Sequence, residues 1–232
     1  MGLPTLSLPS FPITIPSTGQ EITYRPFLVK EEKILLMAME GKDKNEIKIA
    51  INKILDACIN EDIDVNKLPT FDVEYLFLNL RAKSVGEIVT FKLGHSKGKC
   101  EHKTEVAVNL TDITVKGDIK DGIVMLDDKI GVKMHYPTLS TFEKLAGTSE
   151  NLIEALADCI EYVFDDEEVY DDFTNEELVE WMGNLNKPQY TKINEFLNGT
   201  PKLSHDIEWK CEECGKKDKV TLEGLYSFFT LR

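Results

Sequence analysis

The sequence predicts an α+β protein in which helical blocks surround a small β-module of two hairpins joined by a zinc-ribbon-like Cys/His site. Apolar residues recur at helical spacing through long segments such as "EIKIAINKILDACI". In "EIVTFKL" and "TEVAVNL" they instead alternate with polar or smaller residues, which is the period of a half-buried strand. The third observation is the knuckle "CEECG", where Cys211 and Cys214 supply half of a tetrahedral metal site.

The individual elements follow from these two periods. Two of the helices begin with a capping-box pattern, Ser140 with Glu143 and Thr174 with Glu177. The predicted helices cover residues 28–40, 44–59, 71–83, 138–146, 150–164, 174–184 and about 188–198. The predicted strands are "GQEITYRPF", "EIVTFKL", "TEVAVNL", "ITVKG", "IGVKMHY" and the segments on both sides of the knuckle.

These elements predict five consecutive regions. An extended Pro-rich arm (1–18) precedes a strand plus helical block (19–84). The first half of the zinc-ribbon-like β-module (85–136) and its C-terminal half with the Cys-x2-Cys knuckle (201–232) are separated by an inserted helical block (137–200).

Composition argues against several classes of protein. The chain has 232 residues, 42% hydrophobic and 29% charged, and contains no run of 18 apolar residues that could span a membrane. Its net charge of −14 opposes nucleic-acid binding, which depends on clustered Lys and Arg. Residues 161–180 are strongly acidic but lack the ligand spacing and central Gly of a calcium loop, so we expect a solvated linker and helix start.

The five cysteines fall into two groups. The N-terminal "MGLPTLSLPSFP" lacks the basic start and unbroken apolar run of a secretory signal, so we expect reduced thiols. Cys58 and Cys159 lie among helically spaced apolar residues and are predicted to be small core residues. Cys100, Cys211 and Cys214 are left for metal binding.

The fourth ligand is expected from the middle hairpin. When "KVTLEG" is placed over "EVAVNL", Cys214 falls on Cys100, each of them six residues before a Val. His95 then takes the strand-face position of Cys211, so His95, Cys100, Cys211 and Cys214 form a Cys3His zinc set. His102 is the alternative, although residues two apart on a strand hold their side chains about 6.6 Å apart, which is wide for adjacent corners of a tetrahedron.

The predicted zinc ion is structural rather than catalytic. Four protein ligands leave no position for water or substrate. The chain contains no HExxH, nucleophile-elbow, phosphate-loop or Rossmann pattern, and His135 and His205 are isolated. A redox role is disfavoured because the Cys-x2-Cys pair lies between short strands instead of opening a helix. We therefore expect no enzymatic activity and no small-molecule substrate.

The helix predicted in "FDVEYLFLNLR" carries apolar residues on more faces than a helix packed on one side can bury. It could be a central helix buried all round, or it could be half core and half partner interface.

Several long segments, in addition to the Pro-rich start, carry a family resemblance. They are "STGQEITYRPFLVKEEKILLMAME", "LPTFDVEYLFLNLRAKSVGE" and "CEECGKKDKVTLEGLYSFF". They resemble the baseplate hub assembly proteins of T-even-like contractile-tailed phages, also called the T-even base plate protein family. The resemblance implies a non-enzymatic viral protein that assists or forms the central hub of the tail baseplate through contacts with other hub proteins.

The resemblance also implies a location. The protein would act in the host cell cytoplasm during assembly, and whether it stays in the virion tail baseplate is left open. The alternative function is a zinc-ribbon regulator that contacts the transcription machinery or nucleic acid. Residues 208–220 argue against that alternative, because their acidic and basic side chains are equal in number.

Residues 1–16 combine four prolines with six large apolar residues. The prolines disfavour ladder pairing and the apolar residues disfavour a solvated tail. The arm could wrap around its own domain or dock on another hub protein, including by strand addition beside "EITYRPF". Because ordering its backbone costs about 1–2 kcal/mol per residue, we predict that the arm does not hold well on its own module and docks on a partner.

Overall fold

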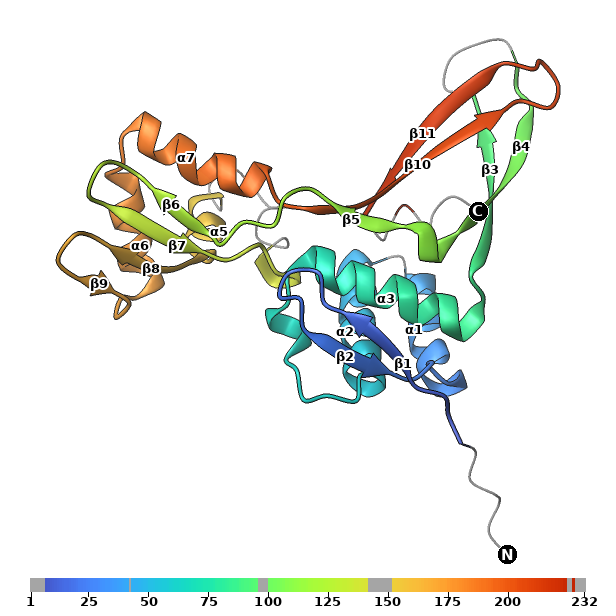
Figure 1. The fold of residues 1–232 in the computed structure, drawn as a ribbon, viewed down its shortest axis with the longest axis horizontal. Coiled ribbons are helices and arrows are strands. Elements are labelled where there is room, and N and C mark those ends of the chain that lie inside the picture. Colours follow the sequence, from blue (N-terminus) through green and yellow to red (C-terminus); the bar gives the residue numbers. More distant parts are fainter. Residues whose placement is uncertain (1–6, 42, 96–99, 142–151, 225–226, 228–232) are drawn as a thin grey trace, which may run out of the picture. The chain divides into compact units, whose positions relative to one another are not determined.

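The computed structural model describes residues 7–41, 43–95, 100–141, 152–224 and 227 (Figure 1). The chain divides into two compact units. Unit 1 contains Met1–Val65, Phe71–Lys116 and Lys202–Arg232, and unit 2 contains Asn66–Thr70 and Gly117–Pro201. The predicted α+β class is confirmed, with the strands of the described residues arranged in small separate sheets. No helix in the described part of the chain is long and apolar enough to cross a membrane.

The first part of unit 1, which we name the helical block, packs a short hairpin with three helices. Its elements are β1 (Phe11–Thr14), β2 (Glu21–Tyr24), α1 (Val29–Gly41), α2 (Lys44–Cys58) and α3 (Thr70–Val85). The 3-10 turn Val65–Lys67 and the first residue of α3 lie where the chain passes between the two units. Figure 1 shows α3 next to the hairpin, and Tyr24 Oη donates to Asn79 O (3.4 Å) between them. The buried residues of α3 cover most of its circumference; they are Phe71, Asp72, Val73, Leu76, Phe77, Leu78, Leu80 and Ala82. The helix is therefore central and buried, the first of the two alternatives left open by its sequence.

The N-terminal hairpin corrects the prediction for the arm. All four residues of β1 pair with β2 in an antiparallel ladder, and Ile15, directly after β1, is only 1% exposed. The expectation that residues 1–16 do not hold on their own module is wrong for residues 11–16, because the apolar burial and the ladder bonds are available within the same unit. Residues 7–10 are exposed and outside any strand, and residues 1–6 of the expected arm lie outside the described part of the chain.

Proline is tolerated in β1 because of where it lies in the ladder. Pro12 is opposite Thr23, whose N–H donates to Glu61 Oε2 (2.8 Å) and whose carbonyl accepts from the Asn60 N–H (3.0 Å). Since these groups of Thr23 face away from β1, the backbone of Pro12 faces the free edge, where its missing N–H breaks no bond. The same proline lacks the N–H donor that an added strand would need, so it also disfavours the pairing of another strand at this edge.

The second part of unit 1 is the β-module. It comprises β3 (Ile88–Gly94), β4 (Lys103–Asn109), a 3-10 turn (Leu110–Asp112), β5 (Thr114–Lys116), β10 (Lys202–Lys210) and β11 (Lys217–Glu223). β3 pairs with β4 and β10 pairs with β11, both antiparallel, and β5 pairs with the start of β10. The two hairpins converge on a common tip (Figure 1), and the Glu212 N–H donates to Thr104 Oγ1 (3.2 Å) between them. Both predicted hairpins are therefore present.

Unit 2 is mixed rather than helical, which corrects the predicted block 137–200. Its sheet has the order β6 (Ile123–Met125), β7 (Gly131–Met134), β8 (Ile160–Phe164) and β9 (Val169–Tyr170), and its helices are α5 (Leu152–Ala157), α6 (Asn175–Gly183) and α7 (Lys187–Asn198). The insertion begins at Gly117, because "IGVKMHY" pairs within this sheet and not with the β-module.

The helix predicted over 150–164 is also wrong in its second half. The chain leaves the helix after Ala157, and residues 160–164 form β8, where β-branched and aromatic side chains pair with β7. The capping box of Thr174 with Glu177 is confirmed. The box of Ser140 with Glu143 and most of the helix 138–146 lie outside the described residues.

Candidate metal centre

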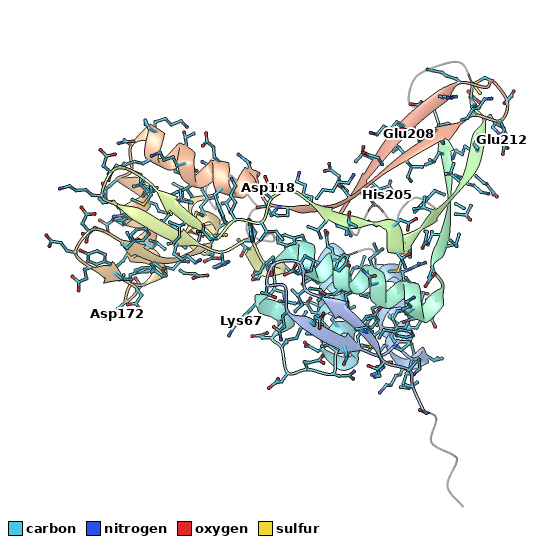
Figure 2. The ribbon with its side chains drawn as sticks, viewed as in Figure 1. Lys67, Asp118, Asp172, His205, Glu208 and Glu212 are labelled. Carbon is cyan, nitrogen blue, oxygen red and sulfur yellow. The ribbon has the colours of Figure 1, made fainter. Side chains whose placement is uncertain are left out.

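The tip of the β-module is built from the four segments that end or begin its hairpin strands. His95 follows the last residue of β3, and Cys100 lies shortly before β4. Cys211 follows the last residue of β10, and Cys214 lies in the turn before β11. Figure 2 labels Glu212 in this region, whereas His205 lies nearer the other end of β10. Because each hairpin is antiparallel, the end of its first strand and the start of its second strand lie at the same tip.

The four predicted ligands lie together in a compact group. Cys100 Sγ is 3.8 Å from Cys211 Sγ, and His95 Nε2 is 3.3 Å from Cys214 Sγ. One donor atom from each residue lies within 4.8 Å of all the others. Zinc–sulfur bonds near 2.3 Å in a tetrahedron separate two sulfurs by about 3.8 Å. The spacing of the donors therefore fits a tetrahedral metal ion.

The turn after β10 prepares Cys211 as a ligand. The Cys211 N–H donates to Lys216 O (2.9 Å) and the Gly215 N–H donates to Cys211 O (3.0 Å). Gly215 has a φ of 71°, a left-handed conformation that glycine adopts without a steric penalty. The N–H groups of Cys214 and Glu213 turn toward Cys211 Sγ and, against the effect of burial, lower the pKa of Cys211 to about 6. The thiolate that a metal requires is thus favoured by the backbone.

His95 is oriented by two residues of the second hairpin. Its Nδ1 is 3.0 Å from Asp218 Oδ2, and its ring stacks on Trp209 with centroids 5.0 Å apart. Asp218, followed by Cys214 and Cys211, raises the pKa of His95 to about 9. A carboxylate on one imidazole nitrogen leaves the other nitrogen directed at the ligand group, which is the arrangement that holds metal-bound histidines.

Sequence reasoning missed Asp218 and Trp209 as parts of this site. Asp218 was counted only as one charge of a neutral segment. The signal that could have found it is the hairpin register, which places Asp218 opposite Trp209, next to the knuckle. A search for a carboxylate able to reach the ring of His95 would then have selected it.

The remaining cysteines and histidines lie outside the group. His102 faces two glutamates, with Nδ1 3.6 Å from Glu213 Oε2 and Nε2 3.8 Å from Glu212 Oε2. Cys58 and Cys159 are both 0% exposed, which confirms them as core residues, and burial raises their pKa values to about 11 and about 12. Among the His, Cys, Asp and Glu side chains of the described residues, the four predicted ligands are the ones that lie close enough together to hold a metal ion.

The fold and the site define a mixed α+β protein with a Cys3His centre of the type that structural metal sites use. A family profile described as T4 bacteriophage base plate protein matches residues 8–230. The chain therefore belongs to this family, and the resemblance inferred from its sequence is confirmed. It is 25% identical over 213 residues to the baseplate hub assembly protein gp26 of Enterobacteria phage T4. The aligned residues cover 90% of this chain and 93% of that protein. No solved structure matches the chain.

Proposed function

We propose that the protein helps to build, or forms part of, the central hub of a contractile phage tail baseplate, and that it does so by protein–protein contacts without catalysis. The observation that carries this proposal is the family match over residues 8–230, together with the relative that is named for hub assembly. The partners would be other baseplate hub proteins, met in the cytoplasm of the host cell or in the virion tail baseplate.

Zinc held by His95, Cys100, Cys211 and Cys214 would complete the β-module. The donor spacing and the thiolate-favouring turn at Cys211 support this assignment. When bound, the ion would supply four bonds that tie the ends of the two hairpins together and no open position for a substrate. Asp218 and Trp209 would fix the ring of His95, with Nδ1 toward the carboxylate and Nε2 toward the metal.

The alternative of a zinc-ribbon regulator finds less support. Nucleic-acid ribbons carry basic side chains around the knuckle. Here Glu212 and Glu213 lie in the knuckle itself, and Lys219 is 3.1 Å from the carboxylate of Asp206. A regulator of this kind would bind DNA or RNA with an affinity that falls steeply as salt is raised, and we expect no such binding.

The hub proposal is tested in the phage that encodes this chain. Deletion of its gene should stop baseplate formation before the hub is complete, and supply of the wild-type chain from a plasmid should restore it. Mass spectrometry of purified virions beside infected-cell lysate then separates a retained subunit from a factor that leaves. Normal hubs in the deletion phage would refute the proposal.

The zinc proposal has a separate test. Metal analysis of the purified full chain should give about one zinc per chain. Cys211→Ser and His95→Ala should lose the metal, whereas His102→Ala, the matched control, should retain it. Loss of metal in His102→Ala with no change in His95→Ala would assign the fourth ligand to His102 instead.

A further inference from the structure

Helix α1 directs an apolar stripe away from the core. Its buried positions are Glu31, Leu35 and Ala38. On the outer side, Leu36 is 51% exposed and Met37 is 62% exposed. An amphipathic surface helix normally places polar residues there, so this stripe indicates a contact surface.

Two opposite charges lie on the midline of the same outer face. Lys33 and Glu40 are both exposed and are seven residues apart, which is close to two helical turns. Lys33 lies three positions before Leu36, and Glu40 lies three positions after Met37. A two-fold rotation about the midpoint between Leu36 and Met37 therefore places each of these two charges on the position of the opposite charge.

We propose that α1 pairs with α1 of a second copy of this chain, antiparallel, about a two-fold axis that passes between Leu36 and Met37. In this arrangement each Leu36 faces the partner's Met37, and each Lys33 faces the partner's Glu40. A two-fold interface requires this kind of self-complementary surface.

Charge explains why the occupant is a second copy in this orientation. A parallel pair would bring like charges together at both Lys33 and Glu40. The net charge of −14 makes two copies repel each other at long range, and the opposite charges facing each other across this contact offset part of that repulsion. Since α1 has 13 residues and is about 20 Å long, the contact is small and the dimer should be weak.

Sedimentation velocity of the full-length chain from about 10 μM to about 1 mM tests the proposal. The wild-type chain should shift from monomer to dimer across this range. K33E and E40K should each weaken the association about tenfold or more, since two attractive pairs become repulsive. The double variant K33E/E40K should recover it, and an equimolar mixture of the K33E and E40K chains should form mixed dimers.

V169D is the matched control, because Val169 on β9 is a comparably exposed apolar residue at 56% and lies in the other unit. It should leave the monomer–dimer equilibrium unchanged, and circular dichroism should show that every variant is folded. A wild-type chain that stays monomeric throughout, or a mixture of K33E and E40K that fails to associate, overturns the proposal. If the wild-type chain and L36D are both monomeric, and L36D alone fails to bind one of the phage's own hub proteins, then α1 docks on that protein and self-pairing is wrong.

Discussion

The two parts of unit 1 are held together in different ways. In the helical block, α3 is buried over most of its surface, and Phe77 and Leu78 are 0% exposed. In the β-module the strands are short ribbons with one buried face, and β11 buries only Leu222 among its seven residues. The ligand group lies at the end of the module where this thin core stops. The comparison teaches that the proposed metal ligands lie where apolar burial is too small to fix the chain by itself.

Metal removal should have the largest effect and should separate the two parts. Structural zinc contributes about 10–16 kcal/mol of apparent binding free energy in finger peptides. We expect that chelation, or Cys211→Ser, unfolds the β-module while far-ultraviolet circular dichroism of the helices is largely kept. Hydrogen exchange resolved by residue checks this: protection should fall in 88–109 and 202–223 and persist in α3. Simultaneous loss of protection in both parts would show that they unfold as one.

A large-to-small substitution in the core of the helical block should destabilise that part and leave the metal centre intact. Phe77→Ala removes a fully buried ring, which typically costs about 3–5 kcal/mol. Denaturant unfolding of the chain should show this loss in the transition of the helical block. The zinc content should stay unchanged, because the hydrogen bonds of the four ligands within the described residues go to one another and to the β-module and not to α3. Loss of zinc in Phe77→Ala would contradict the independence of the two parts.

The helical block should also carry a pH dependence of its own. Burial raises the pKa of Asp72 to about 6 from its ordinary 3.8, although the N–H and hydroxyl of Ser17 both donate to its carboxylate and oppose the shift. Because the folded pKa is the higher one, the stabilisation is fully present below about pH 4 and is lost as pH rises through about 6.

Asp72→Asn removes this titration and keeps the shape of the side chain. The stability difference between wild type and Asp72→Asn should change by about 2 kcal/mol between pH 4 and pH 7, in favour of wild type at the acidic end. Urea unfolding at both pH values measures it. The control is Asp112→Asn, which makes the same chemical change at an exposed position of the same unit. A flat difference for Asp72→Asn would mean that the buried carboxyl is not protonated in this range.

Asp218 should have a smaller effect, limited to the metal centre. Asp218→Ala removes the partner of His95 Nδ1, and loss of such a partner typically weakens metal affinity about 10–100-fold. Competition with a chromophoric chelator measures the change, and Asp206→Ala, an exposed aspartate on β10 that contacts no ligand, is the control. Equal affinities for the two variants would show that Asp218 does not support the ring.

The sequence predicted most elements and the four residues that the structure brings together in the Cys/His cluster, because helical period, strand alternation and cysteine spacing are local signals. The capping box at Thr174 is one example. Residues 150–164 were misassigned because a short apolar run fits either period, and pairing with β7 decides between them. Pro12 was taken to disfavour strand pairing for a similar reason, because only the ladder shows that its nitrogen faces a free edge. Asp218 reaches His95 across 123 positions of chain, which no local pattern encodes.

The smallest effect is expected at the N-terminus, where the boundary between arm and core can be located. Residues 7–10 are exposed, and Leu8 is 40% exposed. Deletion of residues 2–9 should therefore change the unfolding free energy by no more than about 0.5 kcal/mol, the range of ordinary surface changes. Deletion of residues 2–16 removes β1 and the buried Ile15 as well, and the melting temperature should fall by several degrees. If the shorter deletion keeps the melting temperature but abolishes co-purification of another hub protein, residues 2–9 form the docking arm. If it keeps both, the arm has no such role, and a large fall in melting temperature would show that these residues are part of the core.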